Sequence, residues 1–280
     1  LSIKITKMIA KLFALVGDTE NSAEWNKRYA EKAEIVNSLY WDDSDGFYYD
    51  IDINTHKHYK VMTPASYWAM TAELAPRERA DRMAKYVSDP ETLGGKVPLT
   101  SLSRSDSDYS PEGEYWRGGV WMPTAYAALK GLSNYGYHAK AREAADKIIS
   151  HMYKTYTCFE PHTIWEAYSP EKYMPSTTAH KNGELVRRDF CGWSALGPIS
   201  MFIEFVLGFH TVNAFEKVVG WEKPTDVKGN IGIKNLRFGD IVTDIEAVGN
   251  RCTVESNGEY TLKICGREYS VGAGVTEIEL

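Results

Sequence analysis

The sequence lacks the features that mark a nucleic-acid-binding, membrane or zinc protein. Acidic residues outnumber basic ones, 38 to 32, so the formal net charge is -6 and neither nucleic acid nor an anionic membrane is an expected partner. No apolar run approaches the roughly 20 residues that cross a bilayer. The 4 cysteines show no CxxC or CxxH spacing, so no metal site is expected. The remaining composition is that of an ordinary globular protein.

An initiating methionine is also absent, since the chain begins with Leu1. Lysines recur at three- and four-residue spacing among the apolar residues up to Val16, which predicts an amphipathic helix and not a signal peptide. We therefore expect the chain to open inside a fold, with the N-terminal half of its own polypeptide as its partner. A periplasmic or secreted location is slightly favoured over a cytoplasmic one.

Aromatic residues, in contrast, are abundant. They make up 12% of the chain, with 8 Trp and 18 Tyr, and many fall in stretches rich in Gly, Pro and Ser. Their rings have an apolar face and a polar edge, which suits the CH face and the hydroxyls of a sugar. For any single ring, packing in the core is the alternative interpretation.

Apolar periodicity divides the chain into a helical part and a β part. Helices are predicted over residues 2–16, 22–39, 64–74, 76–87, 120–134, 138–156 and 193–208. Residues 88–119 and 158–190 read as long irregular loops, a length typical of functional segments. Beyond residue 209, short alternating segments separated by Gly and Asn predict strands. We expect a helical domain over 1–210 and a small β-sandwich-like domain over 211–280.

The helices form pairs joined by alternating short and long loops. Antiparallel hairpins with every long loop on one face would gather the strings WDDSDGFYYD, EYWRGGVW and IWEAYSPE around one cleft. This arrangement predicts a mainly α fold, an (α/α)6-barrel or toroid. Only about half of the helices of a complete barrel are present, so the barrel is expected to be partial.

Four strings carry a family resemblance. They are LYWDDSDGFYYDID (39–52), GEYWRGGVWMPTAYAALKGLSNYGY (113–137), IWEAYSPE (164–171) and FCGWSALGPI (190–199). In this order, over about residues 20–210, the chain resembles the C-terminal half of glycoside hydrolase family 63 and its trehalase-like relatives. The resemblance implies an inverting glycosidase, an exo-acting α-glucosidase of oligosaccharides that needs no cofactor.

Glu166 is the predicted general base. Inverting hydrolysis needs one carboxylic acid to protonate the leaving oxygen and one carboxylate to activate water, about 6.5–9.5 Å apart. Glu166 suits the second task because it stands in a loop between Trp165 and Tyr168, and the resemblance implies the same role. The alternative is a Glu that only caps or pairs within its loop.

Arg117, Trp116 and Trp121 are predicted to bind the sugar. The guanidinium can donate a planar fork of hydrogen bonds to vicinal hydroxyls, and the two rings can wall a subsite. The alternative for Arg117 is an ion pair with Glu166 or Glu114 that holds loops together. Family relatives usually have Pro at the position of Gly119, so a looser backbone is expected there.

Three further aromatic residues and one carboxylate complete the predicted sugar site. Trp165 and Tyr168 flank the base, and Trp193 resembles a pocket-lining position, with a core residue at a helix start as its alternative. Asp50 is the predicted substrate contact in the loop after Trp41. The other aspartates of that loop could ligate calcium, although their spacing does not match an EF-hand and a capped helix end with a tight turn at Gly46 is the favoured interpretation.

The general acid has no counterpart in this sequence. In the family it is an Asp in a Gly-Trp-Asp motif, whereas Gly192-Trp193 is followed by Ser and Gly220-Trp221 by Glu. We therefore expect a fragment of a longer enzyme that lacks the acid. A carbohydrate-binding protein without catalysis, or a sugar epimerase on the same toroid, are the alternatives.

Overall fold

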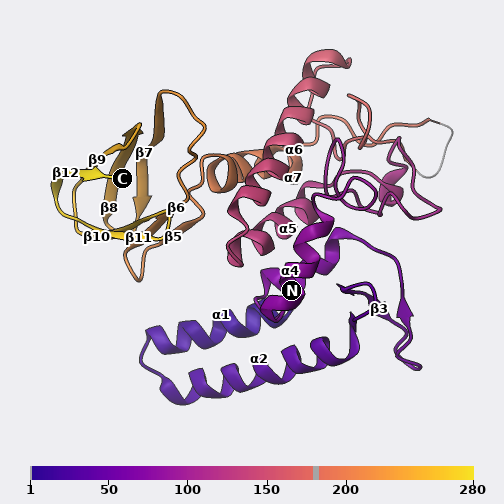
Figure 1. Ribbon diagram of the computed structural model, residues 1–280, viewed down its shortest axis with the longest axis horizontal. Helices are drawn as coiled ribbons and strands as arrows, with labels where there is room; N and C mark the ends of the chain where they lie inside the picture. Colours follow the sequence, from indigo (N-terminus) through magenta and orange to yellow (C-terminus); the bar gives the residue numbers. More distant parts are fainter. Residues whose placement is uncertain (1, 179–182) are drawn as a thin grey trace. The chain divides into compact units, whose positions relative to one another are not determined.

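The computed structural model describes residues 2–178 and 183–280. The chain divides into two compact units, Leu1–Pro198 and Ile199–Leu280. Helices dominate the first unit and strands the second (Figure 1). The chain as a whole is mixed α and β, so the expected mainly α class describes the first unit alone.

The first unit opens with an antiparallel helical hairpin of α1 (Ser2–Leu15) and α2 (Thr19–Leu39) (Figure 1). The Asp18 carboxylate caps α2, since it accepts a hydrogen bond of 3.0 Å from the backbone N–H of Asn21. The remaining helical elements are η1 (Pro64–Tyr67), α3 (Trp68–Thr71), α4 (Arg77–Tyr86), α5 (Met122–Asn134), α6 (His138–Cys158) and α7 (Trp193–Met201).

One predicted helix is shorter than expected. Residues 64–74 form a 3₁₀ turn followed by a single α-helical turn, and Glu73 ends the segment with a left-handed φ of 56°. The N–H of Leu74 then bonds to the carbonyl of Ala69 at 3.0 Å, a pattern that terminates helices. The Pro64 start was predicted, whereas this termination was not.

Helix α5 is the central element of the first unit. Its buried residues lie on several sides, which include Ala125, Ala128 and Leu129, and it packs against both α3 and α6. Gly131 permits close approach to α3, because a Cβ there would lie 2.9 Å from the Cβ of Met70. The first turn of this helix, directly after the string EYWRGGVW, is therefore fixed on a buried support.

Short strands and irregular backbone connect these helices. β1 (Trp41–Asp42) pairs with β2 (Phe47–Tyr48), and β3 (Asp50–Ile51) pairs with β4 (His58–Tyr59). The long loop before α5 contains the 3₁₀ turn η2 (Tyr115–Arg117). Among the described residues, no helix is both long and apolar enough to cross a membrane.

The second unit is built from two four-stranded sheets, ordered β11-β10-β6-β5 and β12-β9-β8-β7. The strands are β5 (Thr211–Asn213), β6 (Val218–Trp221), β7 (Asn230–Phe238), β8 (Ile241–Val248), β9 (Arg251–Ser256), β10 (Tyr260–Ile264), β11 (Arg267–Val271) and β12 (Gly274–Glu279). Both sheets contribute to one apolar core, including Trp221 and Ile245, as in a β-sandwich.

The sequence placed the division between the units at residue 210, whereas it falls between Pro198 and Ile199. A π-helical turn, η3 (Phe202–Val206), follows α7. Ile203 and Leu207 pack against the core of the second unit, and Trp221 donates its indole N–H to the Leu207 carbonyl at 2.8 Å. This segment therefore belongs with the sheets despite its helical sequence pattern.

Candidate active site

Two long loops of the first unit are joined by backbone pairing. Val120 and Tyr168 exchange both hydrogen bonds, at 2.9 and 3.2 Å, and Tyr168 also bridges to Pro175. The strings EYWRGGVW and IWEAYSPE, far apart in the sequence, thus lie side by side. The predicted convergence of these two loops is observed.

Glu166 is held by its backbone. Its N–H donates to the Arg187 carbonyl at 2.9 Å, while its own carbonyl accepts from the Trp193 indole at 3.1 Å and from the Ser194 hydroxyl at 2.9 Å. These bonds fix the start of α7 against the loop that contains Glu166. In the described part of the chain, no Lys or Arg forms an ion pair with the Glu166 carboxylate.

Tyr115 is a side chain whose pKa Glu166 influences. Burial, and then the charge of Glu166 and a hydrogen bond to it, raise the pKa of the Tyr115 phenol above its ordinary value. Tyr115 was not among the predicted site residues. One aromatic in a run of aromatics gives no signal by itself, so the sequence did not single it out.

Three tryptophans surround this pair. Trp116 and Trp121 stack with ring centroids 4.3 Å apart and planes at 13°, and Trp193 lies 6.3 Å from Trp121. Tyr115 meets Trp121 edge-on at 4.7 Å. Trp116 is 53% exposed and Trp193 40% exposed, whereas Trp121 is 3% exposed. The structure therefore brings together an accessible aromatic surface and Glu166.

The backbone of this loop is tightly constrained. Glu114 and Tyr115 take left-handed φ values of 34° and 64°. Gly119 is buried, and a Cβ added there would lie 2.6 Å from the Tyr115 carbonyl oxygen. At Gly119 the absence of a side chain lets two backbone segments meet, and the expected looser backbone stays a prediction.

Arg117 is engaged by other acids. It bonds to the Glu114 carboxylate at 2.6 Å and to the Asp108 carbonyl at 2.9 Å, and pairs with the Asp108 carboxylate at 3.6 Å. Of the two pairings considered from the sequence, the one with Glu114 is observed. Since Arg117 remains exposed, its guanidinium also borders the solvent beside Trp116.

Trp165 and Tyr168 lie beneath the loop and not on its surface. Trp165 is 4% exposed and packs edge-on against Phe159 at 5.9 Å. Tyr168 is 2% exposed, and its hydroxyl accepts a hydrogen bond from the backbone N–H of Trp165 at 3.2 Å. Burial raises the pKa of Tyr168 to about 12. These two buried residues support the loop that contains Glu166.

Asp50 belongs to a different part of the first unit. It lines a cavity of 290 Å³ together with residues that include Tyr40, Tyr49 and Trp68. Three other aspartates of its loop, Asp42, Asp43 and Asp45, have protein cations as partners. Asp42 pairs with Lys60 at 2.9 Å, and Asp43 with Arg82 at 2.9 Å. These contacts favour the structural interpretation of the aspartates over the calcium alternative.

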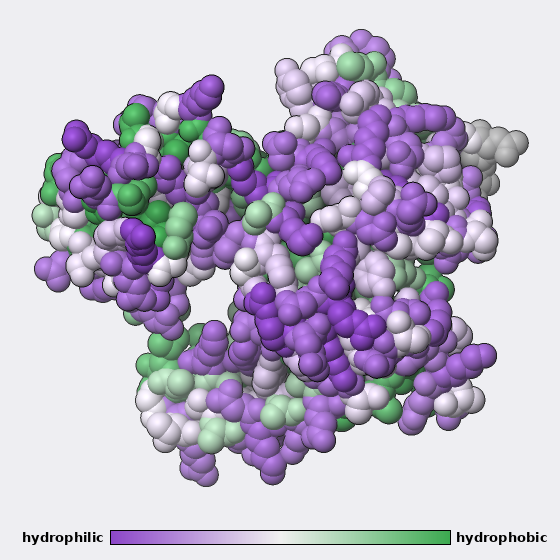
Figure 2. Space-filling model, viewed as in Figure 1, coloured by the Kyte–Doolittle hydropathy of each residue, from purple (hydrophilic) through white to green (hydrophobic). Residues whose placement is uncertain are grey.

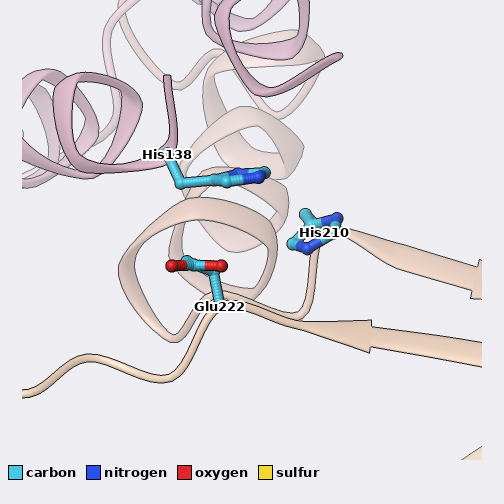
Figure 3. A group of neighbouring side chains, drawn as sticks. All are labelled: His138, His210 and Glu222. Carbon is cyan, nitrogen blue, oxygen red and sulfur yellow. The ribbon is translucent and has the colours of Figure 1, made fainter. Parts of the chain in front are cut away.

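The second unit carries two potential metal ligands of its own. His210 precedes β5 and Glu222 follows β6, and their ligand atoms lie within 4.8 Å (Figure 3). Figure 3 also draws His138, which starts α6 in the first unit. Two ligand groups within one unit do not form a metal site, and we assign none.

Comparison with known proteins identifies the family. A family model described as the mannosylglycerate hydrolase MGH1-like glycoside hydrolase domain matches residues 3–182. The chain belongs to this family. The MGH1-like match includes Tyr115, Trp121 and Glu166, so both joined loops lie within it. The predicted resemblance to family 63 and the trehalases is confirmed.

Relatives of this MGH1-like chain are longer than it is. A protein of Borreliella burgdorferi is 30% identical over 78% of this chain and 46% of its own length. The mannosylglycerate hydrolase of Rubrobacter radiotolerans is 31% identical over 50% of this chain and 32% of its own length. A periplasmic trehalase of Escherichia coli is 25% identical over 69% of this chain and 32% of its own length. The chain spans a third to a half of these relatives.

A solved structure shares the fold. The GH63 mannosylglycerate hydrolase of Thermus thermophilus, in complex with Tris, superposes with a TM-score of 0.54 and 22% identity. The superposition covers 72% of this chain and 43% of that one. At this identity the likeness concerns the fold alone. It supports the helical fold of the first unit, and a closed (α/α)6-barrel is a proposal.

Proposed function

We propose that this chain supplies the base-bearing part of an inverting, exo-acting glycoside hydrolase. Glu166 activates the attacking water, and Trp116, Trp121 and Trp193 line the sugar subsites. Arg117 contacts hydroxyls at the rim, Asp50 contacts the substrate from its own loop, and Trp165 and Tyr168 hold the base loop in place. An α-linked glucoside or oligosaccharide is the proposed substrate, with mannosylglycerate as a second candidate because a relative is named for it.

A single observation carries this proposal. Glu166 lies beside exposed tryptophans, since the Trp193 indole donates to its carbonyl, and its carboxylate has no ion pair with a described cation. Aromatic rings orient a sugar through its CH face, and a positioned carboxylate can take a proton from water. A non-catalytic sugar-binding protein would need the rings, but it would not need a half-buried carboxylate beside them.

We further propose that the general acid is supplied by residues outside this chain. Helix α1 presents an apolar stripe of Ile5, Met8, Leu12 and Leu15, each about half exposed. Figure 2 shows green, hydrophobic surface where Figure 1 draws this helix. Such a stripe on a surface helix is typical of a face covered by another helix. The N-terminal half of a longer polypeptide would cover it and complete a barrel.

The test is NMR of this chain with mannosylglycerate, trehalose and a panel of other α-glucosides. We expect line broadening of at least one sugar, which reports binding at the aromatic surface. Without the acid we expect no turnover, and addition of the N-terminal half of a family relative should restore it. A product released first as the inverted anomer would support the inverting mechanism.

The matched variants are Glu166→Gln and Glu112→Gln. The first removes the proposed base and should abolish turnover in the complemented enzyme while sugar binding persists. The second removes an exposed carboxylate that pairs with Lys172 at 2.7 Å and should leave turnover unchanged. Full activity of Glu166→Gln would overturn the assignment of the base.

A periplasmic or secreted location remains our proposal for the complete protein. It is supported by the relative that is named a periplasmic trehalase. Fractionation of cells that express the complete gene product would test it, since the protein should appear outside the cytoplasmic fraction.

A further inference from the structure

We propose that Ser194 is a positioning residue for Glu166, which acts through the backbone of Glu166 and not through its carboxylate. This inference rests on the proposed function, because positioning has a purpose only if Glu166 is the base. In the string FCGWSALGPI, Trp193 is the proposed sugar contact, and Ser194 has no role in that contact. Both residues belong to the segment 187–194, which we call the clamp segment because it binds Glu166 at two points.

The clamp segment holds both backbone polar groups of Glu166. At one end of the segment, the Arg187 carbonyl accepts the Glu166 N–H at 2.9 Å. At the other end, the Trp193 indole N–H and the Ser194 hydroxyl both donate to the Glu166 carbonyl, at 3.1 and 2.9 Å. The peptide groups before and after the Cα of Glu166 therefore each have a fixed partner. Because these two planar groups define φ and ψ of Glu166, they also set the direction of its Cα–Cβ bond.

The residues on either side of Glu166 are held in the same way. The Phe190 N–H, within the clamp segment, donates to the Ile164 carbonyl at 2.9 Å. On the other side, the Ala167 carbonyl accepts the Ser176 N–H at 3.1 Å. A rotation of the backbone at Glu166 would therefore break hydrogen bonds of its neighbours as well.

The two donors stand on a helix that is packed against a buried support. Trp193 and Ser194 open α7, and Gly197 of the same helix lies against Met122, the first residue of α5. A Cβ added at Gly197 would lie 2.8 Å from the Cβ of Met122, so the glycine permits this close approach. Met122 is 1% exposed. The clamp therefore holds Glu166 in a fixed relation to the start of α5.

Ser194 is the donor whose effect can be separated from sugar binding. It is 0% exposed, so a substrate does not touch it, whereas Trp193 is 40% exposed. An effect of Ser194 on catalysis must therefore pass through the residues that it contacts, of which Glu166 is one. A carbonyl oxygen has two lone pairs, which matches its two donors here. Loss of one donor lets the peptide group turn, and a misplacement of about 1 Å can cost about 100-fold in rate.

Amide hydrogen exchange of this chain, followed by NMR, tests the clamp without turnover. The Glu166 N–H should exchange slowly in the native protein, because it is bonded within the clamp. In Ser194→Ala its exchange should accelerate about fivefold, which corresponds to the loss of one hydrogen bond. The double variant Trp193→Phe/Ser194→Ala, which removes both donors, should exchange faster still. Unchanged exchange of the Glu166 N–H in the double variant would overturn the proposal.

Thr71→Val is the matched control. Thr71 is another buried hydroxyl of the same unit, 2% exposed, and it donates to the Ala127 carbonyl at 2.5 Å. Thr71→Val and Ser194→Ala each take a buried hydroxyl from a backbone carbonyl, so urea unfolding should show similar losses of stability. Without denaturant, Thr71→Val should leave the exchange of the Glu166 N–H unchanged. Equal acceleration in both variants would indicate general loosening of the unit and would overturn the proposal.

Turnover in the complemented enzyme separates positioning from a structural role. Ser194→Ala should lower kcat about tenfold and change KM less than about twofold, because the base is displaced while the sugar contacts remain. Thr71→Val should leave both values unchanged at a similar loss of stability. Ser194→Thr keeps the hydroxyl and should retain kcat within about twofold, although its additional methyl group is expected to lower stability. An equal loss of kcat in Ser194→Ala and Ser194→Thr, or a raised KM at constant kcat, would overturn the positioning role.

The two hypotheses fail in different ways. The exchange measurement needs no turnover, so it decides whether the clamp holds Glu166 even if no sugar is hydrolysed. Faster exchange in Ser194→Ala at unchanged kcat would overturn the positioning role and leave Glu166 as the base. Full activity of Glu166→Gln would overturn the base, and with it the purpose assigned to Ser194.

Discussion

The carboxylates of the 41–60 loop and the carboxylate of Glu166 differ in their partners. Asp42 pairs with Lys60 and with His58, and Asp45 pairs with the same Lys60. Glu166 has no ion pair with a described Lys or Arg, and its charge raises the pKa of Tyr115. Both loops are acidic and aromatic in sequence, so composition alone does not distinguish them.

The difference shows how the partner determines the role of a carboxylate. Hydrogen bonds from Ser44, the Asp45 backbone and Lys60 hold the pKa of Asp42 well below its usual range, and an anion stabilised in this way is a poor base. Arg82, which lies on α4, pairs with Asp43 of this loop. These contacts give the aspartates a structural role, and Glu166 stays the proposed base.

The largest expected effect concerns the tryptophans beside Glu166. Trp121→Ala removes a ring that is 3% exposed and should lower the free energy of unfolding by about 3–5 kcal/mol. Trp116→Ala removes its exposed stacking partner and should cost less than about 1 kcal/mol while weakening sugar binding about tenfold. Urea unfolding and NMR sugar titration measure the two effects. Equal losses of stability would contradict the division into a buried support and an exposed platform.

A smaller effect is expected from the backbone of the site. Gly113→Ala places a Cβ 2.1 Å from the Ser176 hydroxyl at a φ of 101°, and should destabilise the chain by about 2–4 kcal/mol. Gly136→Ala has a similar φ of 79° with open space around it, and should cost only about 1–2 kcal/mol. Thermal unfolding of both variants checks this order. The reverse order would show that the loop relaxes freely.

The smallest effect concerns the 41–60 loop and depends on pH. Because the folded-state pKa of Asp42 is depressed, its contribution is present above the unfolded value of about 3.9 and is lost as the pH falls through the folded pKa. Asp42→Asn should therefore be about 1–2 kcal/mol less stable at pH 7, and the difference should shrink below about pH 4. Asp43→Asn, whose carboxylate is 89% exposed, should change little. Urea unfolding between pH 7 and pH 3 measures both variants, and a constant difference for Asp42→Asn would contradict the assignment.

Much of the fold was accessible from local pattern. Apolar periodicity predicted α1, α2, α5 and α6 within a few residues. Buried residues line α5 and α6, whereas α2 has none, so the prediction of α2 came from its spacing pattern alone. The termination at Glu73 and the transfer of Leu207 to the sheet unit were not predictable, because both depend on contacts between segments distant in sequence. Periodicity reports that a face is buried and not which unit covers it.

The site was predictable as a set of loops, less so as individual side chains. The order of the strings placed Trp116, Trp121 and Trp193 near Glu166, as the structure does. The left-handed φ of Tyr115 was not predictable, because no residue type announces it at that position. The burial of Trp165 was equally hidden, since neighbours in a loop alternate between inside and outside without a fixed period.

The pairing of Val120 with Tyr168 has a consequence for redesign. The two loops are joined there through peptide groups, so the joint does not depend on which side chains the neighbouring positions carry. The ring at 116 can therefore be exchanged while the spacing between the loops is retained, whereas Trp193 donates its indole N–H to the Glu166 carbonyl and belongs to the frame. The frame and the exposed ring at 116 can be engineered separately.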